Sequence, residues 1–201
     1  MKFLSSFLSS GAVFLALGAF QPAQADLVAW WPLDEDASDA TGNGHDGEVV
    51  GGDVIFGQPG ANLGTGLSAS FPDNGHIDVP FSEDLNPGTQ EENGSGSFTI
   101  ALWVNANSAE GNFNSPVTAR EDNGQTVNGP IIYNTPANVW SFWAGNNGPP
   151  GAWNSLDHDS GTEPGTWQHI AITYDSDEIL RTLYVDGEVA QTSDLGISAN
   201  A

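Results

Sequence analysis

A run of three short apolar segments separated by turns, near the end of the chain, constrains the fold more than any other feature. Residues 167–174 are rich in aromatic and β-branched side chains, which suit a pleated, half-buried surface. A polar Asp/Ser turn follows, and then a second apolar run at 179–185. Asp186 and Gly187 form a strong hairpin signal, because a type I′ turn needs positive φ at both central residues. With a third strand at 188–191, the segment predicts an antiparallel meander and an all-β fold.

Short runs with period-two alternation fill much of the remaining chain. Residues 98–104 carry apolar side chains on both faces, as expected of a strand that is covered on both sides. Residues 131–133 and 139–143 are typical of a strand pair, and residues 67–71 and 77–79 of a hairpin. The chain has 25 glycines and 12 prolines that punctuate these runs, and long helical periodicity is missing.

Four stretches together resemble the laminin-G-like (concanavalin A-like) jelly-roll domains of secreted bacterial proteins. In order along the chain they match the family's opening strand, the loop after it, its central strand and its late hairpin: 27–34 (LVAWWPLD), 39–47 (DATGNGHDG), 97–104 (SFTIALWV), and 167–175 (WQHIAITYD) with 183–188 (LYVDGE). The resemblance covers most of residues 27–192. It implies a two-sheet antiparallel jelly-roll sandwich.

The two ends of the domain follow from the same resemblance. Residues 26–33 are expected to form the opening strand, in which the adjacent Trp30 and Trp31 point to opposite faces and one of them enters the core. The family's closing strand has no counterpart before Ala201. We therefore expect one jelly-roll domain over residues 26–201 that lacks its last strand or strands and is part of a longer protein.

Residues 1–25 are predicted to be a signal peptide that is removed on export. Lys2 precedes an apolar stretch, and a small-x-small site at Ala23 and Ala25 stands directly before Asp26. A membrane anchor is the alternative, but the stretch lacks an unbroken span of about 20 apolar residues. We expect the mature chain to be secreted, periplasmic or on the cell surface, without a membrane span. It has no cysteine, so its stability must come from a packed core or bound ions.

The charge of the chain is extreme, with 26 acidic residues against 3 basic ones and a formal net charge of −23. After removal of the signal peptide, Arg120 and Arg181 are the only Lys or Arg residues. Such a surface repels phosphate groups, so nucleic acid and anionic membranes are poor partners. A buried or bridging pair between Arg120 and a carboxylate is expected. Nothing in the sequence pattern indicates an oligomeric state.

The segment 34–47 is crowded with oxygen donors between glycines. Calcium takes 6–8 oxygen ligands from carboxylates, amides and backbone carbonyls, and these residue types fit, although the spacing is not that of an EF-hand. Laminin-G-like domains often carry a structural calcium at the rim of the sandwich, so the resemblance implies a site here. The predicted calcium ligands are drawn from Asp34, Asp39, Asn43 and Asp46. The alternative is a hydrogen-bonded turn rich in Asp and Asn.

A Gly/Pro-rich loop after the second member of the strand pair carries the strongest signal for a ligand. Sugars stack on exposed aromatic rings that are flanked by hydrogen-bonding Asn and Asp side chains. Such a mixture predicts a polysaccharide or glycan site made of Trp143, Asn146, Trp153, Asn154 and Asp157. The alternative is that both tryptophans close the sandwich as core residues, because Trp is usually largely buried.

The sequence lacks a recognisable pattern for catalysis. Glycoside hydrolysis needs two carboxylates about 5–10 Å apart, and the Glu-x-Asp-x-x-Glu strand of laminarinase-type jelly rolls does not occur. His76 is typical of a solvated turn, and His158 has a flanking Asp on each side but no nucleophile placed for it. We predict no catalytic residues.

Three functions remain open at this point. The first is an exported, non-catalytic carbohydrate-binding or adhesion module. The second is a structural spacer or assembly domain of a larger surface protein. A glycoside hydrolase or lyase is the third, since the fold alone can host all of them.

Overall fold

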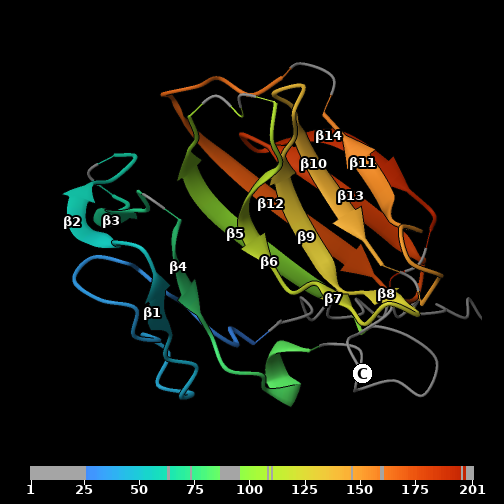
Figure 1. The fold of residues 1–201 in the computed structure, drawn as a ribbon, viewed down its shortest axis with the longest axis horizontal. Coiled ribbons are helices and arrows are strands. Elements are labelled where there is room, and N and C mark those ends of the chain that lie inside the picture. The colour runs from blue at the N-terminus through green and yellow to red at the C-terminus, as the bar shows by residue number, and fades with distance from the viewer. Residues whose placement is uncertain are drawn as a thin grey trace, which may run out of the picture.

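The computed structural model describes residues 26–62, 64–72, 74–86, 96–107, 109, 111–145, 147–158, 161–195 and 197, and Figure 1 shows their arrangement. The predicted signal peptide, residues 1–25, lies outside the described residues. So does Asn146.

The predicted meander forms a four-stranded sheet, called here the hairpin sheet, with the strand order β14-β13-β12-β5. Its strands are β5 (Phe98–Asn105), β12 (Trp167–Asp175), β13 (Leu180–Val185) and β14 (Glu188–Ser193). All neighbours are antiparallel. Asp186 and Gly187 have φ values of 51° and 83°, as the type I′ turn requires. The meander is confirmed.

A second four-stranded sheet, called here the aromatic sheet, has the order β11-β10-β9-β6. Its strands are β6 (Asn114–Thr118), β9 (Pro130–Asn134), β10 (Trp140–Ala144) and β11 (Asn154–Asp157). The predicted strand pair is β9 with β10, in which Ile132 lies opposite Phe142. Pro116 lies in the edge strand β6, where its missing N–H does not interrupt a ladder.

The two sheets lie face to face and enclose the hydrophobic core (Figure 1). Period-two alternation sends one face of each strand inward, and the fully buried side chains include Ile132, Trp140, Phe142, Ile170, Ile172 and Leu183. Trp140 donates its Nε1–H across the core to Gln168 Oε1 at 2.9 Å, so the polar atom of this large side chain is satisfied. Each large apolar side chain buried in this way contributes about 1.5–3 kcal/mol. The two-sheet antiparallel sandwich is confirmed.

Residues 26–86 lie beside the sandwich (Figure 1). They contain β1 (Glu48–Gly51), β2 (Ile55–Pro59), β3 (Leu67–Ser70), β4 (Gly75–Asp78) and the 3-10 helix η1 (Glu83–Leu85). Here β1 pairs with β4 and β2 with β3, all antiparallel.

The predicted hairpin between residues 67–71 and 77–79 is therefore wrong. The chain reverses between β2 and β3 instead, where the Asn62 side chain accepts from Gly64 N at 2.8 Å and the Asn62 carbonyl accepts from Thr65 N at 3.1 Å. Two Asn/Gly turn signals lie within fifteen residues of each other, and local chemistry alone does not decide which one closes the hairpin.

The predicted opening strand is also wrong, because residues 26–33 belong to no strand. Trp30 N donates to the Asp39 carboxylate at 3.0 Å rather than to a neighbouring strand. Pro32 has no N–H to donate, and Leu33 leaves the extended region with φ 62°. The Trp30 side chain is 55% exposed, while Trp31 is half-buried and donates its Nε1–H to the carbonyl of His45 at 2.7 Å. Neither tryptophan belongs to the sandwich core.

The strand β5 is covered on one face only. Phe98, Ile100, Leu102 and Val104 pack against the core, as the alternation predicts. On the other face Trp103 is 44% exposed and has the ring of His169 as its aromatic neighbour, 5.3 Å away. The prediction of cover on both faces is thus wrong for the outer face, which no other described sheet covers.

Two smaller features complete the described chain. β7 (Glu121–Asp122) and β8 (Val127–Asn128) form a two-stranded ribbon next to the aromatic sheet. Within the described residues, no helix has the length and apolar character needed to cross a lipid bilayer.

Candidate ligand-binding face

The outer face of the aromatic sheet presents the residues that alternate with the core. On β10, Phe142 points inward, so Ser141 and Trp143 point outward. The strand register places Tyr133 of β9 opposite Ser141 on one side, and Asp157 of β11 opposite Ser141 on the other. These side chains therefore form a row across three strands.

Three aromatic rings gather on this face. The ring centroids of Phe113 and Tyr133 are 5.1 Å apart, and each of these rings lies 5.4 Å from the ring of Trp143. All three contacts are edge-to-face, a geometry worth about 0.5–1.5 kcal/mol per pair beyond the area buried. Phe113 is 50% exposed, and the other two rings are half-buried. The cluster is ordered by its own contacts and still open to solvent.

Arg120 extends this cluster to the second predicted tryptophan. Its guanidinium carbon lies 5.5 Å from the centre of the Trp153 ring, a cation–π arrangement, and its Nη2 donates to the Asp122 carboxylate at 2.9 Å. The hydrogen bond with Asp122 raises the pKa of Arg120, and an interaction with Tyr133 raises it further. The same hydrogen bond lowers the pKa of Asp122. Arg120 thus pairs with a carboxylate, as expected, but the pair is local and its Arg120 side chain is 46% exposed, so it is not buried.

We define the aromatic patch as Phe113, Arg120, Tyr133, Trp143 and Trp153. The first four lie on or beside β6, β9 and β10, whereas Trp153 comes from the loop before β11. Backbone bonds tie that loop to β8: Val127 N donates to Gly148 O and Asn147 N donates to Val127 O, both at 3.0 Å. These bonds hold the loop against the two-stranded ribbon that follows Arg120.

Asp157 supplies a polar group on the same outer face. Ser141 Oγ donates to Asp157 Oδ1 at 2.5 Å, and Ser141 itself is fully buried. The Asp157 side chain is exposed, so its second carboxylate oxygen can accept hydrogen bonds from a ligand hydroxyl.

The structure thus separates the five predicted glycan-binding residues. Trp143, Trp153 and Asp157 lie on or beside one face. Asn154 has the same alternation as the buried Leu156, and its backbone carbonyl accepts from the Arg181 Nη1 at 3.2 Å. Asn146 lies outside the described residues.

Sequence reasoning missed three members of the patch, because Arg120 was expected only to pair with a carboxylate, and Phe113 and Tyr133 were not assigned to a site. Tyr133 could have been found, because it alternates with the buried Ile132 in a predicted strand. Phe113 comes from a loop with no periodic signal, and only the packing against Tyr133 and Trp143 reveals its place.

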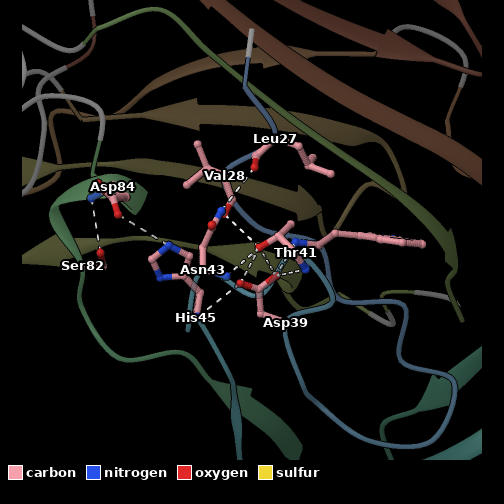
Figure 2. A network of polar contacts seen from close by, with 9 residues as sticks. Leu27, Val28, Asp39, Thr41, Asn43, His45, Ser82 and Asp84 are labelled. Carbon is pink, nitrogen blue, oxygen red and sulfur yellow. Dashed lines mark hydrogen bonds and ion pairs between the residues drawn. The ribbon is translucent and has the colours of Figure 1, made fainter.

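The predicted calcium loop is organised by Asp39, which is 7% exposed (Figure 2). Its carboxylate accepts from Trp30 N, Thr41 N and Thr41 Oγ1, and from His45 N. Burial alone would raise the pKa of Asp39, but these hydrogen bonds outweigh burial and lower the pKa far below its ordinary range.

The other three predicted calcium ligands also bond to the backbone. Asp34 accepts from Leu67 N at 2.7 Å, Asp46 accepts from Asp39 N at 2.8 Å, and Asn43 donates to Val28 O at 2.7 Å. Among the described residues, no three acidic, His or Cys side chains are placed to hold one metal ion. This geometry fits the hydrogen-bonded turn better than a shared calcium shell, and calcium binding stays a prediction.

A cavity of about 470 Å³ lies near this loop and shares no lining residue with the aromatic patch. Next to it, His45 Nε2 is 3.8 Å from a carboxylate oxygen of Asp84 (Figure 2). The cavity is lined by Asp26, Leu27, Val28, Asn43 and Asp84. It contains no aromatic platform, so we place the candidate ligand site on the aromatic patch.

The fold and the patch define an antiparallel β-sandwich domain with an aromatic surface on one sheet. The chain belongs to the Concanavalin A-like lectin/glucanases superfamily, whose laminin-G-type model matches residues 73–201. No curated protein sequence matches it.

A solved structure from Bacteroides ovatus, described as a "putative carbohydrate binding protein", is similar to this chain at 21% sequence identity and a TM-score of 0.35. The match covers 53% of this chain and 28% of that protein, so this chain spans much less than two thirds of it. Similarity at this level does not define a shared ligand.

Proposed function

We propose that this chain is an exported, non-catalytic carbohydrate-binding module that holds a glycan on the aromatic patch. The observation that carries the proposal is the continuous set of contacts from Phe113 through Tyr133 and Trp143 to Arg120 and Trp153. Partly exposed rings of this kind offer flat apolar surface to the C–H face of a sugar. Asp157 adds a hydrogen-bond acceptor on the same face of the sheet.

The test is binding to immobilised and soluble polysaccharides with Trp143→Ala and Trp153→Ala. We expect each variant to bind about tenfold more weakly, which corresponds to the loss of about 1.4 kcal/mol. Trp30→Ala is the matched control, because Trp30 is also exposed but belongs to no strand of either sheet. Binding that all three variants weaken equally, or that none weakens, would remove the patch from the proposal.

A role in assembly is the second candidate, and one observation favours it. The outer face of the hairpin sheet exposes Trp103, and β5 pairs with β12 alone among the described strands. Open strand edges can pair with another chain. If the folded protein binds no polysaccharide at millimolar concentration, the assembly role gains support.

Hydrolysis is not part of the proposal. Asp122 and Asp157 lie at the patch, but Asp122 is paired with Arg120, which lowers its pKa, whereas a general acid needs a raised pKa. Release of reducing sugar that disappears in Asp157→Asn would contradict the non-catalytic proposal.

A further inference from the structure

We propose that the aromatic patch selects uncharged glycans, and that Arg120 positions Trp153 instead of receiving an anionic sugar; this inference rests on the proposed function. The argument begins with the scarcity of positive charge. Of the two arginines in the described chain, Arg181 is fully buried in the sandwich, so Arg120 is the cation that a surface ligand can reach.

Arg120 is already engaged on two sides. Nη2 donates to Asp122 at 2.9 Å, and Cζ of the guanidinium lies over the Trp153 ring, 5.5 Å from its centre. A guanidinium has five N–H donors and Asp122 engages Nη2, so a carboxylate or sulfate on a ligand would have to share Arg120 with Asp122. The ligand anion and Asp122 would then lie next to each other as like charges, which disfavours binding of the anion.

The remaining charges around the patch are negative. Asp157 is exposed on the same face, and its partner Ser141 is neutral. Asp122 balances the charge of Arg120, so the group of three charged side chains Arg120, Asp122 and Asp157 carries a net negative charge.

The whole molecule acts in the same direction. A formal net charge of −23 repels a polyanion during approach, and this repulsion is strongest at low salt. Neutral hydroxyl-rich polymers do not experience it. Stacking on the rings and hydrogen bonds to Asp157 remain available to them.

The experiment compares neutral polysaccharides with sulfated or carboxymethylated derivatives of the same backbones, using the full chain and a panel of several backbones. Chelator is present throughout, because a divalent cation could bridge the carboxylates of protein and polymer. For each backbone that the protein binds, we expect the neutral polysaccharide to bind at least about tenfold more tightly than its charged derivative at about 10 mM salt. The difference should shrink at about 1 M salt, where the screening length falls to about 3 Å.

Asp122→Asn tests the role of Arg120 directly. Releasing the guanidinium should raise the charged-to-neutral affinity ratio at least about fivefold, a change that loss of structure alone would not produce. Asp177→Asn in the exposed turn after β12 is the control, because it makes the same change in net charge on the hairpin sheet instead of the aromatic sheet.

The outcomes are separable. Equal or tighter binding of the charged derivatives by the wild-type chain would overturn the inference while leaving the proposed function intact. An equal rise of the ratio in Asp122→Asn and Asp177→Asn would overturn the role of Arg120. If no member of the panel binds to the folded chain, the proposed function fails and the inference fails with it.

Discussion

Asp39 shows how one carboxylate can organise a segment that has no regular secondary structure. Its side chain is 7% exposed and joins Trp30, Thr41 and His45 through hydrogen bonds that their N–H groups donate. Buried backbone donors need partners, and this carboxylate supplies them in place of a strand ladder. Segment 26–47 therefore depends on the charged form of one residue.

We expect Asp39→Asn to be less stable than the wild-type chain at neutral pH, since an amide cannot accept as many hydrogen bonds. The folded pKa of Asp39 is depressed, so its contribution is present above the ordinary carboxyl pKa of about 3.9 and is lost as pH falls below it. The stability difference between the two proteins should accordingly narrow below about pH 4. Urea unfolding across this pH range measures it.

Asp36→Asn is the control for this prediction. Asp36 lies in the same loop, but its exposed carboxylate accepts a hydrogen bond from Ser38 N alone among the backbone donors described. We expect a smaller loss of stability at neutral pH. A difference for Asp39→Asn that does not change with pH would contradict the assignment to its charge.

Arg181 is a fully buried cation in the sandwich. Its Nη1 donates to Asn154 O at 3.2 Å, its Nη2 to Ser193 Oγ at 3.4 Å, and the guanidinium carbon lies 5.7 Å from the centre of the Phe142 ring. Burial lowers the pKa of Arg181. Its side chain thus links β13 to the start of β11.

We expect Arg181→Ala to destabilise the domain by about 2–4 kcal/mol, because it leaves a cavity and removes two hydrogen bonds. Arg181→Met should cost less, since it fills most of the volume and removes a buried charge. Urea unfolding of the two variants gives both values. If Arg181→Met lost as much stability as Arg181→Ala, the loss could not be attributed to the cavity.

At the scale of elements, both turns of the meander contain a residue with positive φ, but only one of these two residues, Gly187, suits that conformation. Gly187 has φ 83° and an added Cβ would meet no atom within 4 Å, so only the backbone conformation resists a side chain there. We expect Gly187→Ala to cost about 1 kcal/mol and Gly187→Asn less, because Asn tolerates this region better. Thermal unfolding of both variants checks the order, and equal losses would contradict it.

Ile179 is the reverse case, a β-branched residue with φ 53° at the end of the turn between β12 and β13. Its side chain is 49% exposed, so little packing offsets the unfavourable conformation. Ile179→Gly should therefore stabilise the domain by about 0.5–1 kcal/mol. A loss of stability in chemical unfolding would show that the apolar contacts of Ile179 outweigh the strain.

At the scale of the whole molecule, charge repulsion opposes folding. Because the formal net charge is −23, added NaCl should screen the repulsion and raise the melting temperature at neutral pH. Each 1 kcal/mol of repulsion that is removed should raise the melting temperature by about 2–4 °C. Near the isoelectric pH of about 4.1 the salt effect should vanish. Calorimetry at both pH values makes the comparison, and an equal salt effect at both would point to something other than charge.

The calcium prediction is tested in the same high-salt background. If Asp34, Asp39, Asn43 and Asp46 bind calcium, about 1 mM CaCl₂ should raise the melting temperature more than equal MgCl₂, by mass action on the folded state. Equal shifts would leave the hydrogen-bonded turn as the sole role of these residues.

Sequence reasoning succeeded where the structure depends on residues close together in the chain and failed where it depends on contacts between distant segments. Residues 167–191 were predicted well because alternation and the Asp186-Gly187 turn are local signals. The opening strand was predicted from a resemblance, and Pro32 and Leu33 prevent it in the structure. In the candidate site, Trp143 and Trp153 lie on or beside the outer face of the aromatic sheet, whereas Asn154 shares the inner face with Leu156, because one residue of register decides the face.

The amino-acid sequence by itself determined the antiparallel meander, the all-β class and the acidic character, since strand alternation, turn conformation and charge are properties of neighbouring residues. Only the tertiary structure decided that β1 pairs with β4, that Phe113 joins Tyr133 and Trp143, and that Arg120 meets Trp153. These contacts join segments from different strands and loops. Their geometry depends on how the sheets pack, which no local pattern encodes.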